Sequence, residues 1–287
     1  MSQPEVRKQV RQFYDQVGWQ FVGDTYQNAR YEDLRPVSNE YIHRCHLRVT
    51  PFLQPGGRFL LDAGSGPVQY PEYLAYSREY QKRVCLDISF VALQEARRRI
   101  GEHGLYVVAD VANLPFQTEA FDGVVSLHTL HHLPLTEQKK AYADIYRVLR
   151  TGKRAVVVNG WTESPLMRRT QPLVKFFERV GGWLTRLRGG MAKEKTPEAS
   201  VGNNKPSGTF VQKLDAGWLK REIGSQMPVE IRVWRSVSVR FLRAVIHEAL
   251  AGRFLLRLLF WLEERYPRYF GERGQYPLIV IRKEDRK

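Results

Sequence analysis

Short apolar runs alternate with amphipathic stretches along the middle of the chain, from residue 57 to residue 160. Each apolar run has the length of a buried strand, and the stretches between them place apolar residues near helical spacing. The expected strands are RFLLDA, KRVCLD, GLYVVAD, FDGVVSL and KRAVVV. Strands that alternate with helices form a parallel sheet with helices on both faces. The pattern therefore predicts an α/β fold with a doubly wound, mostly parallel sheet.

The two ends of the chain follow other patterns. Residues 5–20 predict an amphipathic helix, and residues 166–188 predict one or two basic amphipathic helices. Residues 189–208 are rich in Gly, Pro and Lys and have no period, so we expect a mobile loop there. A helix, a strand, an apolar helical stretch and a last strand are expected at residues 215–224, 228–239, 240–266 and 276–283.

The apolar helical stretch near the C-terminus has two interpretations. Arg243, Arg253 and Arg257 interrupt it, so no apolar span reaches the roughly 18 residues that a transmembrane helix needs. It is either a buried helix that packs on the domain, which Gly252 divides in two, or a lipid-facing or substrate-capping element. The sequence leaves both interpretations open.

Composition bounds the class of protein. The chain has 287 residues, 43% of them hydrophobic, which suffices for one large domain or for a domain with an insertion. Cys45 and Cys85 have no neighbour at metal-ligand spacing and imply no disulfide framework. The first residues are charged and lack the apolar core of a signal peptide, so we expect a cytoplasmic protein.

The charge is strongly asymmetric. The net charge is +15, yet residues 1–150 carry 18 Lys and Arg against 17 Asp and Glu, whereas residues 151–287 carry 27 against 13. Such an excess suggests an anionic partner for the second half, which could be an acidic substrate, lipid head groups or nucleic acid. A merely solvated basic surface is the alternative.

Acidic residues end three consecutive expected strands. Asp62, Asp87 and Asp110 are separated by 25 and 23 residues, which is one strand, one helix and one loop each time. Ligands of open parallel sheets bind at the carboxyl ends of the strands. We therefore expect the three carboxylates to line the same edge of the sheet.

A glycine turn follows the first of these acids. It is either an ordinary tight turn between strand and helix or a backbone cradle for a small charged cofactor. Read from Gly64, the turn is G-S-G-P-V-Q, and Gln69 occupies the last position of the dinucleotide fingerprint G-x-G-x-x-G. The fingerprint fails, which argues against a nicotinamide dinucleotide.

These motifs together resemble one enzyme family. The run Asp62-Ala63-Gly64-Ser65-Gly66-Pro67-Val68 is similar to the first motif of class I S-adenosylmethionine-dependent methyltransferases, with Val68 in the place of the third glycine. CLDIS, VVADVANLPF, FDGVVSLHTLHHLP and ADIYRVLRTGKRAVVVN match the same family in order and spacing. The resemblance covers residues 57–160 and is to the methyltransferase type 11 group, which includes ubiquinone and menaquinone biosynthesis enzymes.

The resemblance implies S-adenosylmethionine as cofactor, S-adenosylhomocysteine as product and no metal. By similarity, Asp62 lies toward the amino group of the methionine moiety, and the turn of Ala63, Gly64, Ser65 and Gly66 lies against that moiety. The remaining cofactor-binding residues implied in this way are Asp87 for the ribose hydroxyls, Ile88 and Val111 beside the adenine, Asp110 for the adenine amino group, and Leu127 and His128 near the methyl group.

The resemblance also implies a seven-stranded Rossmann-like sheet with a helical cap insertion. We accordingly divide the chain into four parts. They are an N-terminal helical lid (1–56), the cofactor-binding core (57–160), a basic helical cap insertion with a mobile loop (161–210), and the remainder of the core (211–287) with an inserted apolar helical segment (239–268).

Candidate catalytic residues lie in SLHTLHHLP and in the N-terminal helix. His128 ends a strand that faces the expected pocket and is the first candidate for a general base, with His131 and His132 behind it. Packing and capping of the following helix is the alternative role for all three. Tyr14 could close over the cofactor, contact its sulfonium through a cation–π interaction, or pack in the core.

The acceptor is inferred from what surrounds the core. No Asn/Asp-Pro-Pro-Tyr motif follows the fourth strand, and no RNA-binding motif is appended, which argues against nucleic acid. The basic, partly apolar cap favours a small, partly apolar, anionic or lipid-linked acceptor methylated at oxygen or carbon, with peripheral membrane contact through the basic C-terminal half. Binding of S-adenosylmethionine without catalysis and a nicotinamide-dependent oxidoreductase are the alternatives.

Overall fold

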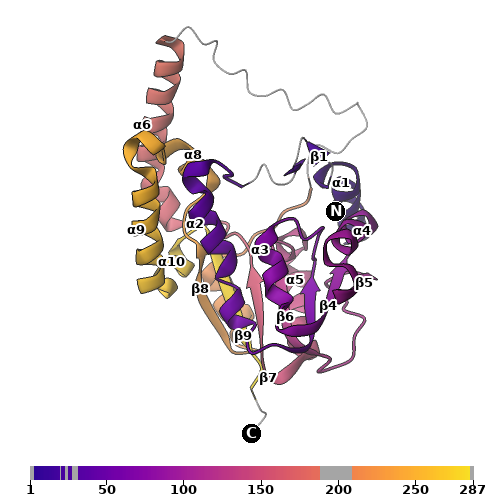
Figure 1. Ribbon diagram of the computed structural model, residues 1–287. Helices are drawn as coiled ribbons and strands as arrows, with labels where there is room; N and C mark the ends of the chain where they lie inside the picture. The colour runs from indigo at the N-terminus through magenta and orange to yellow at the C-terminus, as the bar shows by residue number, and fades with distance from the viewer. Residues whose placement is uncertain (1–2, 20, 23–24, 28–31, 188–208, 285–287) are drawn as a thin grey trace.

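A seven-stranded sheet forms the centre of the protein (Figure 1), in a computed structural model that describes residues 3–19, 21–22, 25–27, 32–187 and 209–284. The strand order is β5-β4-β3-β6-β7-β9-β8, and β9 is antiparallel to both of its neighbours, whereas β5, β4, β3, β6 and β7 are parallel. The strands are β3 (Gly57–Ala63), β4 (Tyr80–Asp87), β5 (Gly104–Val108), β6 (Phe121–Leu127), β7 (Leu149–Val158), β8 (Val229–Arg235) and β9 (Tyr276–Arg282). The predicted doubly wound, mostly parallel sheet is confirmed.

Helices cover both faces of this sheet (Figure 1). Adjacent residues of a strand point to opposite faces, and neighbours such as Leu60 and Leu61 accordingly belong to two different apolar clusters. One cluster includes side chains of α3 and α4, and the other includes side chains of α5 and α7. The helices are α1 (Gln3–Phe13), α2 (Pro36–Leu47), α3 (Pro71–Leu74), α4 (Phe90–Ile100), α5 (Leu135–Val148), α6 (Pro165–Leu187), α7 (Ala216–Glu222), α8 (Val239–Val245), α9 (Gly252–Arg265) and α10 (Pro267–Arg273).

Several element boundaries differ from the sequence prediction. The third strand of the core, β5, ends at Val108, two residues before Asp110, because the chain turns there and the Asn113 amide bonds the Asp110 carbonyl. The helix expected after the glycine turn is reduced to the four residues of α3 and a 3-10 turn. The N-terminal helix passes at Tyr14 into a π-helical turn, Tyr14–Gly18.

The apolar segment at 239–268 is not one helix. It forms α8, a 3-10 turn, α9 and the start of α10, with a break at Ala251, whose φ of 52° is left-handed, and a second break before Pro267. By contrast, α6 runs unbroken through Pro172. The loop predicted at residues 189–208 lies outside the described residues, and the four-part division of the chain stays a prediction. No helix in the described ranges is both long and apolar enough to cross a bilayer.

Candidate active site at the carboxyl ends of the strands

A cavity of about 580 Å³ opens at the carboxyl ends of β3, β4 and β6. The strand order reverses between β3 and β6, which is the position where open α/β sheets bind their ligands, and the volume is typical of a small-molecule site. The predicted site residues that line it are Tyr14, Asp62, Gly64, Ser65, Gly66, Asp87, Ile88, Asp110, Val111, Leu127, His128 and His131. Ala63 does not line it, because its side chain is buried in the core beneath the turn.

The glycine turn at the end of β3 adopts left-handed backbone conformations. Gly64 and Gly66 have φ of 80° and 53°, and a Cβ at Gly64 would overlap the Thr129 side chain, so the turn and the loop after β6 pack too closely for any other residue there. Val68, which stands where the family has a glycine, also adopts φ 53° and is fully buried. A β-branched residue in this region costs about 1–3 kcal/mol. The turn therefore keeps the backbone shape of the family motif despite the substitution.

Asp87 holds this turn against the start of α4. Its carboxylate accepts hydrogen bonds from the Gly66 amide and the Ser89 amide, both at 2.9 Å. Ser89 in turn caps α4 as predicted, accepting from the Ala92 amide at 3.1 Å, and donates to Asp15. Burial raises the pKa of Asp87 to about 6, against the effect of the two amide donors. Asp87 is thus a buried carboxylate at the cavity wall, poorly compensated for its charge.

Asp62 is paired with an arginine that the sequence analysis missed. Arg83 on β4 donates to Asp62 Oδ2 through Nε at 3.1 Å and through Nη2, and its Nη1 donates to the Tyr73 carbonyl at 2.6 Å. Both side chains are almost fully buried. Burial opposes the charge of Arg83, but the Asp62 carboxylate outweighs burial and raises the pKa of the guanidinium. One Asp62 oxygen therefore belongs to a buried ion pair.

Asp110 is bound by the N-terminal helix. Arg7 on α1 lies with Nε 2.6 Å from Asp110 Oδ2, while the Ala112 amide donates to Oδ1 at 2.9 Å. Arg7 also donates to Glu137 on α5 at 3.2 Å. The helix α1 is thereby held over the third acid and closes that end of the cavity.

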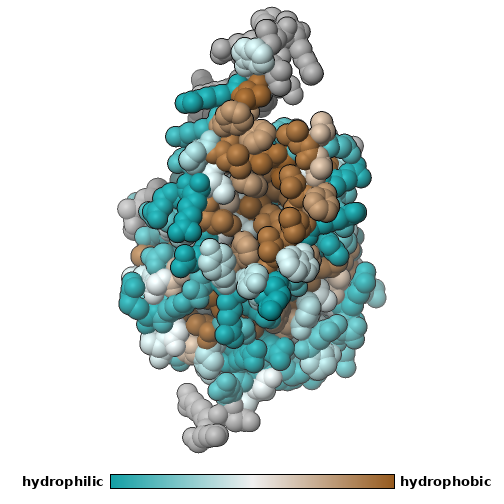
Figure 2. All heavy atoms as spheres, turned by 90° about the vertical axis from the view of Figure 1, so that its left-hand side faces the viewer, coloured by the Kyte–Doolittle hydropathy of each residue, from teal (hydrophilic) through white to brown (hydrophobic). Residues whose placement is uncertain are grey.

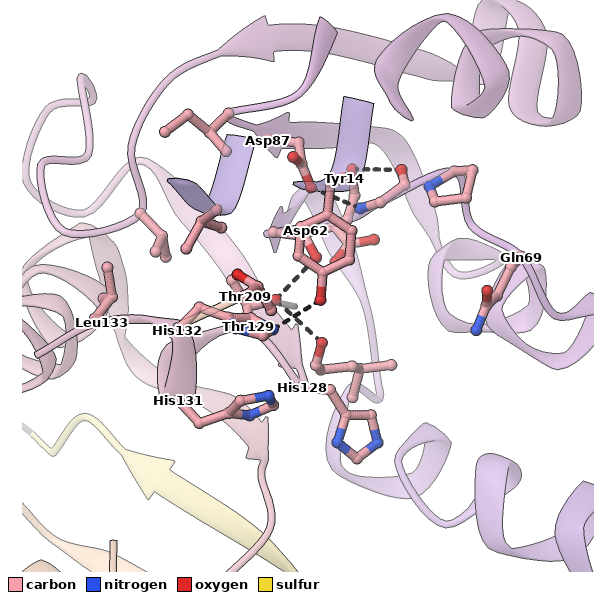
Figure 3. Close-up of a pocket in the computed structure, with 18 of the residues that line it drawn as sticks. Tyr14, Asp62, Gln69, Asp87, His128, Thr129, His131, His132, Leu133 and Thr209 are labelled. Carbon is pink, nitrogen blue, oxygen red and sulfur yellow. Dashed lines mark hydrogen bonds between the residues drawn. The ribbon is translucent and has the colours of Figure 1, made fainter. Parts of the chain in front are cut away.

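Tyr14 and His132 connect three segments at the cavity (Figure 3). His132 Nδ1 lies 2.8 Å from the Phe210 carbonyl, which can only accept, so Nδ1 donates and Nε2 accepts from the Tyr14 hydroxyl at 2.7 Å. Burial lowers the pKa of His132 to about 4, in agreement with a neutral ring. Trp19 stacks on Tyr14 at 4.9 Å between ring centroids and would lie 3.1 Å from a Cβ at Gly66. His132 therefore has a structural role, and Tyr14 lies over the glycine turn with Trp19.

His128 is held in a strained backbone conformation at the end of β6. Its φ is 54°, and its amide donates to the Val158 carbonyl at 2.7 Å, so the ladder with β7 fixes the residue. The ring contacts Trp234 edge-on at 4.9 Å between centroids, and no described residue hydrogen-bonds its nitrogens. Burial lowers the pKa of His128 to about 3, and it lowers that of His131, whose Nδ1 lies 3.2 Å from Asn159 Oδ1. Both rings are neutral at pH 7.

The cavity wall beyond His128 carries charged residues that sequence reasoning did not find. Glu32 forms a buried ion pair with Arg235 on β8, and its Oε2 lies 3.6 Å from His46 Nε2. Burial disfavours the Glu32 charge, but Arg235 and His46 outweigh it and lower the Glu32 pKa to about 2. Lys213 lines the same wall. These residues are far apart in the sequence, so no local motif announces them; the described residues form no metal-ligand cluster here or elsewhere.

Comparison with known proteins assigns a family to the part of the chain that builds this site. A family model described as a methyltransferase domain matches residues 61–157. The Sterol methyltransferase-like 1 of Botryococcus braunii is 28% identical over 166 residues, which are 53% of this chain and 40% of that protein. The malonyl-[acyl-carrier protein] O-methyltransferase of Legionella pneumophila is 33% identical over 103 residues, or 35% of this chain and 36% of that protein. The chain thus spans well under half the length of these relatives.

A solved structure shares the fold over nearly the whole chain. The [4+2]-cyclase SpnF superposes with a TM-score of 0.53 at 18% sequence identity and covers 97% of each chain. At this level of identity the likeness concerns the fold alone. It extends, however, beyond the matched core to the elements at both ends of the chain.

Proposed function

Residues 61–157 belong to the methyltransferase domain family of the class I S-adenosylmethionine-dependent type, and from this premise we propose that the protein transfers a methyl group from S-adenosylmethionine to a small, partly apolar, anionic or lipid-linked acceptor, at oxygen or carbon. The observation that carries the proposal is that Asp62, Asp87 and Asp110 line one cavity together with the glycine turn. S-adenosylmethionine carries a sulfonium and an ammonium group, so acidic walls suit it.

The residues present fit this cofactor. Asp87 offers a buried carboxylate that its neighbours leave incompletely neutralised, as hydrogen bonding to ribose hydroxyls requires. Ile88 and Val111 supply apolar surface on either side of the adenine position, and Gly66 keeps the turn open to a close approach. Asp110 is already paired with Arg7, so the adenine amino group would share that carboxylate or displace the guanidinium.

We propose that the chain contributes by positioning rather than by strong base catalysis. When bound, the cofactor supplies an activated methyl group for in-line transfer to a nucleophile. Holding two reactants in register can lower a barrier by about 7–11 kcal/mol. His128 borders the expected methyl position and stays neutral, so it can accept a hydrogen bond from an acceptor hydroxyl. With a pKa near 3 it is a weak base at neutral pH.

The acceptor proposal rests on the wall beyond His128. Lys213 lines the cavity, and the Nε of Arg235 is buried there without a hydrogen-bond partner among the described residues. Tyr70, Tyr73 and Tyr276 add aromatic surface to the same cavity. Unused cationic donors beside aromatic rings favour an acceptor that combines an anionic or strongly polar group with an apolar body.

A second candidate function is binding of S-adenosylmethionine without methyl transfer. It is favoured by one comparison, because the structure that covers 97% of the chain is that of a [4+2]-cyclase. A nicotinamide-dependent oxidoreductase is disfavoured by Gln69 and by the third acid, Asp110.

Two measurements test the proposal. Calorimetry of the full chain with S-adenosylhomocysteine and with NAD should give saturable binding of the former only, and preferential binding of NAD would contradict the proposed cofactor. Transfer of a labelled methyl group from S-adenosylmethionine to lipid and small-molecule extracts should then give a labelled product. Labelling of tRNA instead, or cofactor binding with no transfer to any extract, would contradict the proposed acceptor class.

A further inference from the structure

One face of α9 exposes a row of large apolar side chains. Phe254, Leu258 and Trp261 are 66%, 44% and 59% exposed and stand at i, i+4 and i+7, on one side of the helix. The opposite side is turned inward, where Leu256 and Glu263 are buried. A surface helix normally buries its apolar stripe and exposes the polar one. Here an apolar stripe faces outward as well.

Helix α6 extends this surface. Leu173, Phe176 and Trp183 on α6 are 44%, 59% and 61% exposed, and Figure 2 shows hydrophobic side chains gathered on the side of the molecule that carries α6 and α9. The apolar face, as we name it, consists of Leu173, Phe176, Trp183, Leu250, Phe254, Leu255, Leu258 and Trp261. A gathering of this kind, unlike single exposed apolar residues, marks an interaction surface.

Basic residues accompany the apolar face. Helix α6 carries five Lys and Arg against one Glu, and residues 239–273 carry seven Arg against four Glu. Some of these arginines are paired, as in Arg240–Glu178 and Arg253–Glu248, but the excess positive charge remains after every glutamate is counted. Exposed Trp, Phe and Leu beside Arg and Lys are typical of helices that lie in the interface of an anionic membrane.

The apolar face is connected to the rim of the cavity. The segment that contains α6 departs from the rim at Gly160, and Thr209, Val211 and Lys213 line the cavity where the chain returns. The return is fixed by the bond between the Gln212 amide and the His131 carbonyl and by the bridge between Trp161 and Leu214. A molecule docked through α6 would thus present this rim to the surface on which it sits.

We propose that the apolar face docks on an anionic lipid bilayer, with α6 and α9 lying in the membrane interface. The docking itself does not depend on the proposed reaction. Only its consequence, delivery of a lipid-linked acceptor to the cavity rim, rests on the proposed function.

The test is co-sedimentation of the full chain with vesicles of phosphatidylcholine and with vesicles that also contain phosphatidylglycerol. Binding should be much stronger to the anionic vesicles and should weaken as salt is added. The double substitution Phe254→Ser/Trp261→Ser should lower the affinity about tenfold or more, because two aromatic side chains lose their burial in the interface. The matched control is Phe90→Ser on α4, an aromatic residue of 59% exposure on another part of the surface, which should bind as the wild type does.

Three results would overturn the proposal. They are absence of binding to anionic vesicles at low salt, equal binding of the double variant and the wild type, and a chain that self-associates through this face but ignores vesicles. Calorimetry with S-adenosylhomocysteine should give the same affinity for the double variant and the wild type, which shows that the variant is folded. Since vesicle binding needs no methyl transfer, failure of the docking test and failure of the proposed reaction are separate outcomes.

Discussion

Single residues at the cavity are held in states that they do not adopt without support. Val68 and His128 are non-glycine residues with left-handed backbone, and Asp87 keeps a buried carboxylate. Such strain persists where the surrounding structure determines it, and it gathers at functional sites. The sequence identified these three positions by motif but could not foresee their energetics, because backbone strain and burial depend on segments distant in the chain.

The raised pKa of Asp87 predicts pH-dependent cofactor binding. Protonation removes the charge that accepts from ribose hydroxyls, so affinity for S-adenosylhomocysteine should be constant above the pKa of about 6 and fall below it, by up to about tenfold per pH unit. Calorimetry between pH 5 and pH 8 measures this. Asp87→Asn should bind weakly at every pH and show a flatter profile. A wild-type profile as flat as that of the variant would exclude Asp87 as the titrating group.

The lowered pKa of His128 predicts a modest catalytic contribution. Asn tolerates left-handed backbone, so His128→Asn removes the imidazole while keeping the conformation. Once an acceptor is identified, kcat should fall less than about 100-fold, below the usual range for loss of a general base, with unchanged affinity for S-adenosylhomocysteine. A fall of 1,000-fold or more, with a pH profile that loses a limb, would instead establish His128 as the base.

At the scale of elements, the alternation of apolar runs was sufficient to predict the strands and the helices between them. Helix α2, Pro36–Leu47, was not predicted although it is long. Its buried side includes Ser38 and His46 as well as Val37 and Tyr41, so the contrast between its faces is weak in the sequence. The break at Ala251 was also not foreseen, since a left-handed alanine has no sequence signature.

The register of β3 and β4 predicts a strong stability effect at Arg83. Asp62 pairs with Cys85 in the ladder, and Arg83, two residues earlier, reaches its carboxylate from within the core. Replacing Arg83 by Met leaves that carboxylate buried without its partner, which should lower the free energy of unfolding by about 3–5 kcal/mol. Urea unfolding checks this. Arg98→Met, which removes an exposed pair with Glu95, is the matched control and should change little.

Restoring charge balance separates the ion pair from simple packing. In the double variant Arg83→Met/Asp62→Leu no buried charge remains unpaired, so a large part of the lost stability should return. If the double variant is less stable by the sum of the two single effects, the pair is not the source of the destabilisation.

At the scale of the whole molecule, the sequence predicted which half carries the positive charge but not how that charge is distributed. Pairs such as Arg257–Glu40 join helices more than 200 residues apart, so their partial neutralisation follows only from the fold. The same holds for the wall formed by Glu32, Lys213 and Arg235, which three distant segments bring together. The cofactor half of the site could be predicted because it lies on consecutive strands; the acceptor half could not.

The most direct test of the account is the affinity of S-adenosylhomocysteine for Asp87→Ala. Asp122→Ala is the matched control, because Asp122 is also a buried carboxylate that accepts two backbone amides, those of Arg58 and Phe59, but it lies at the start of β6, at the opposite edge of the sheet. Calorimetry should show binding to Asp87→Ala weakened tenfold or more, about 1.4 kcal/mol, with Asp122→Ala close to the wild type. Unchanged affinity in Asp87→Ala would contradict the assignment of this edge of the sheet as the cofactor site.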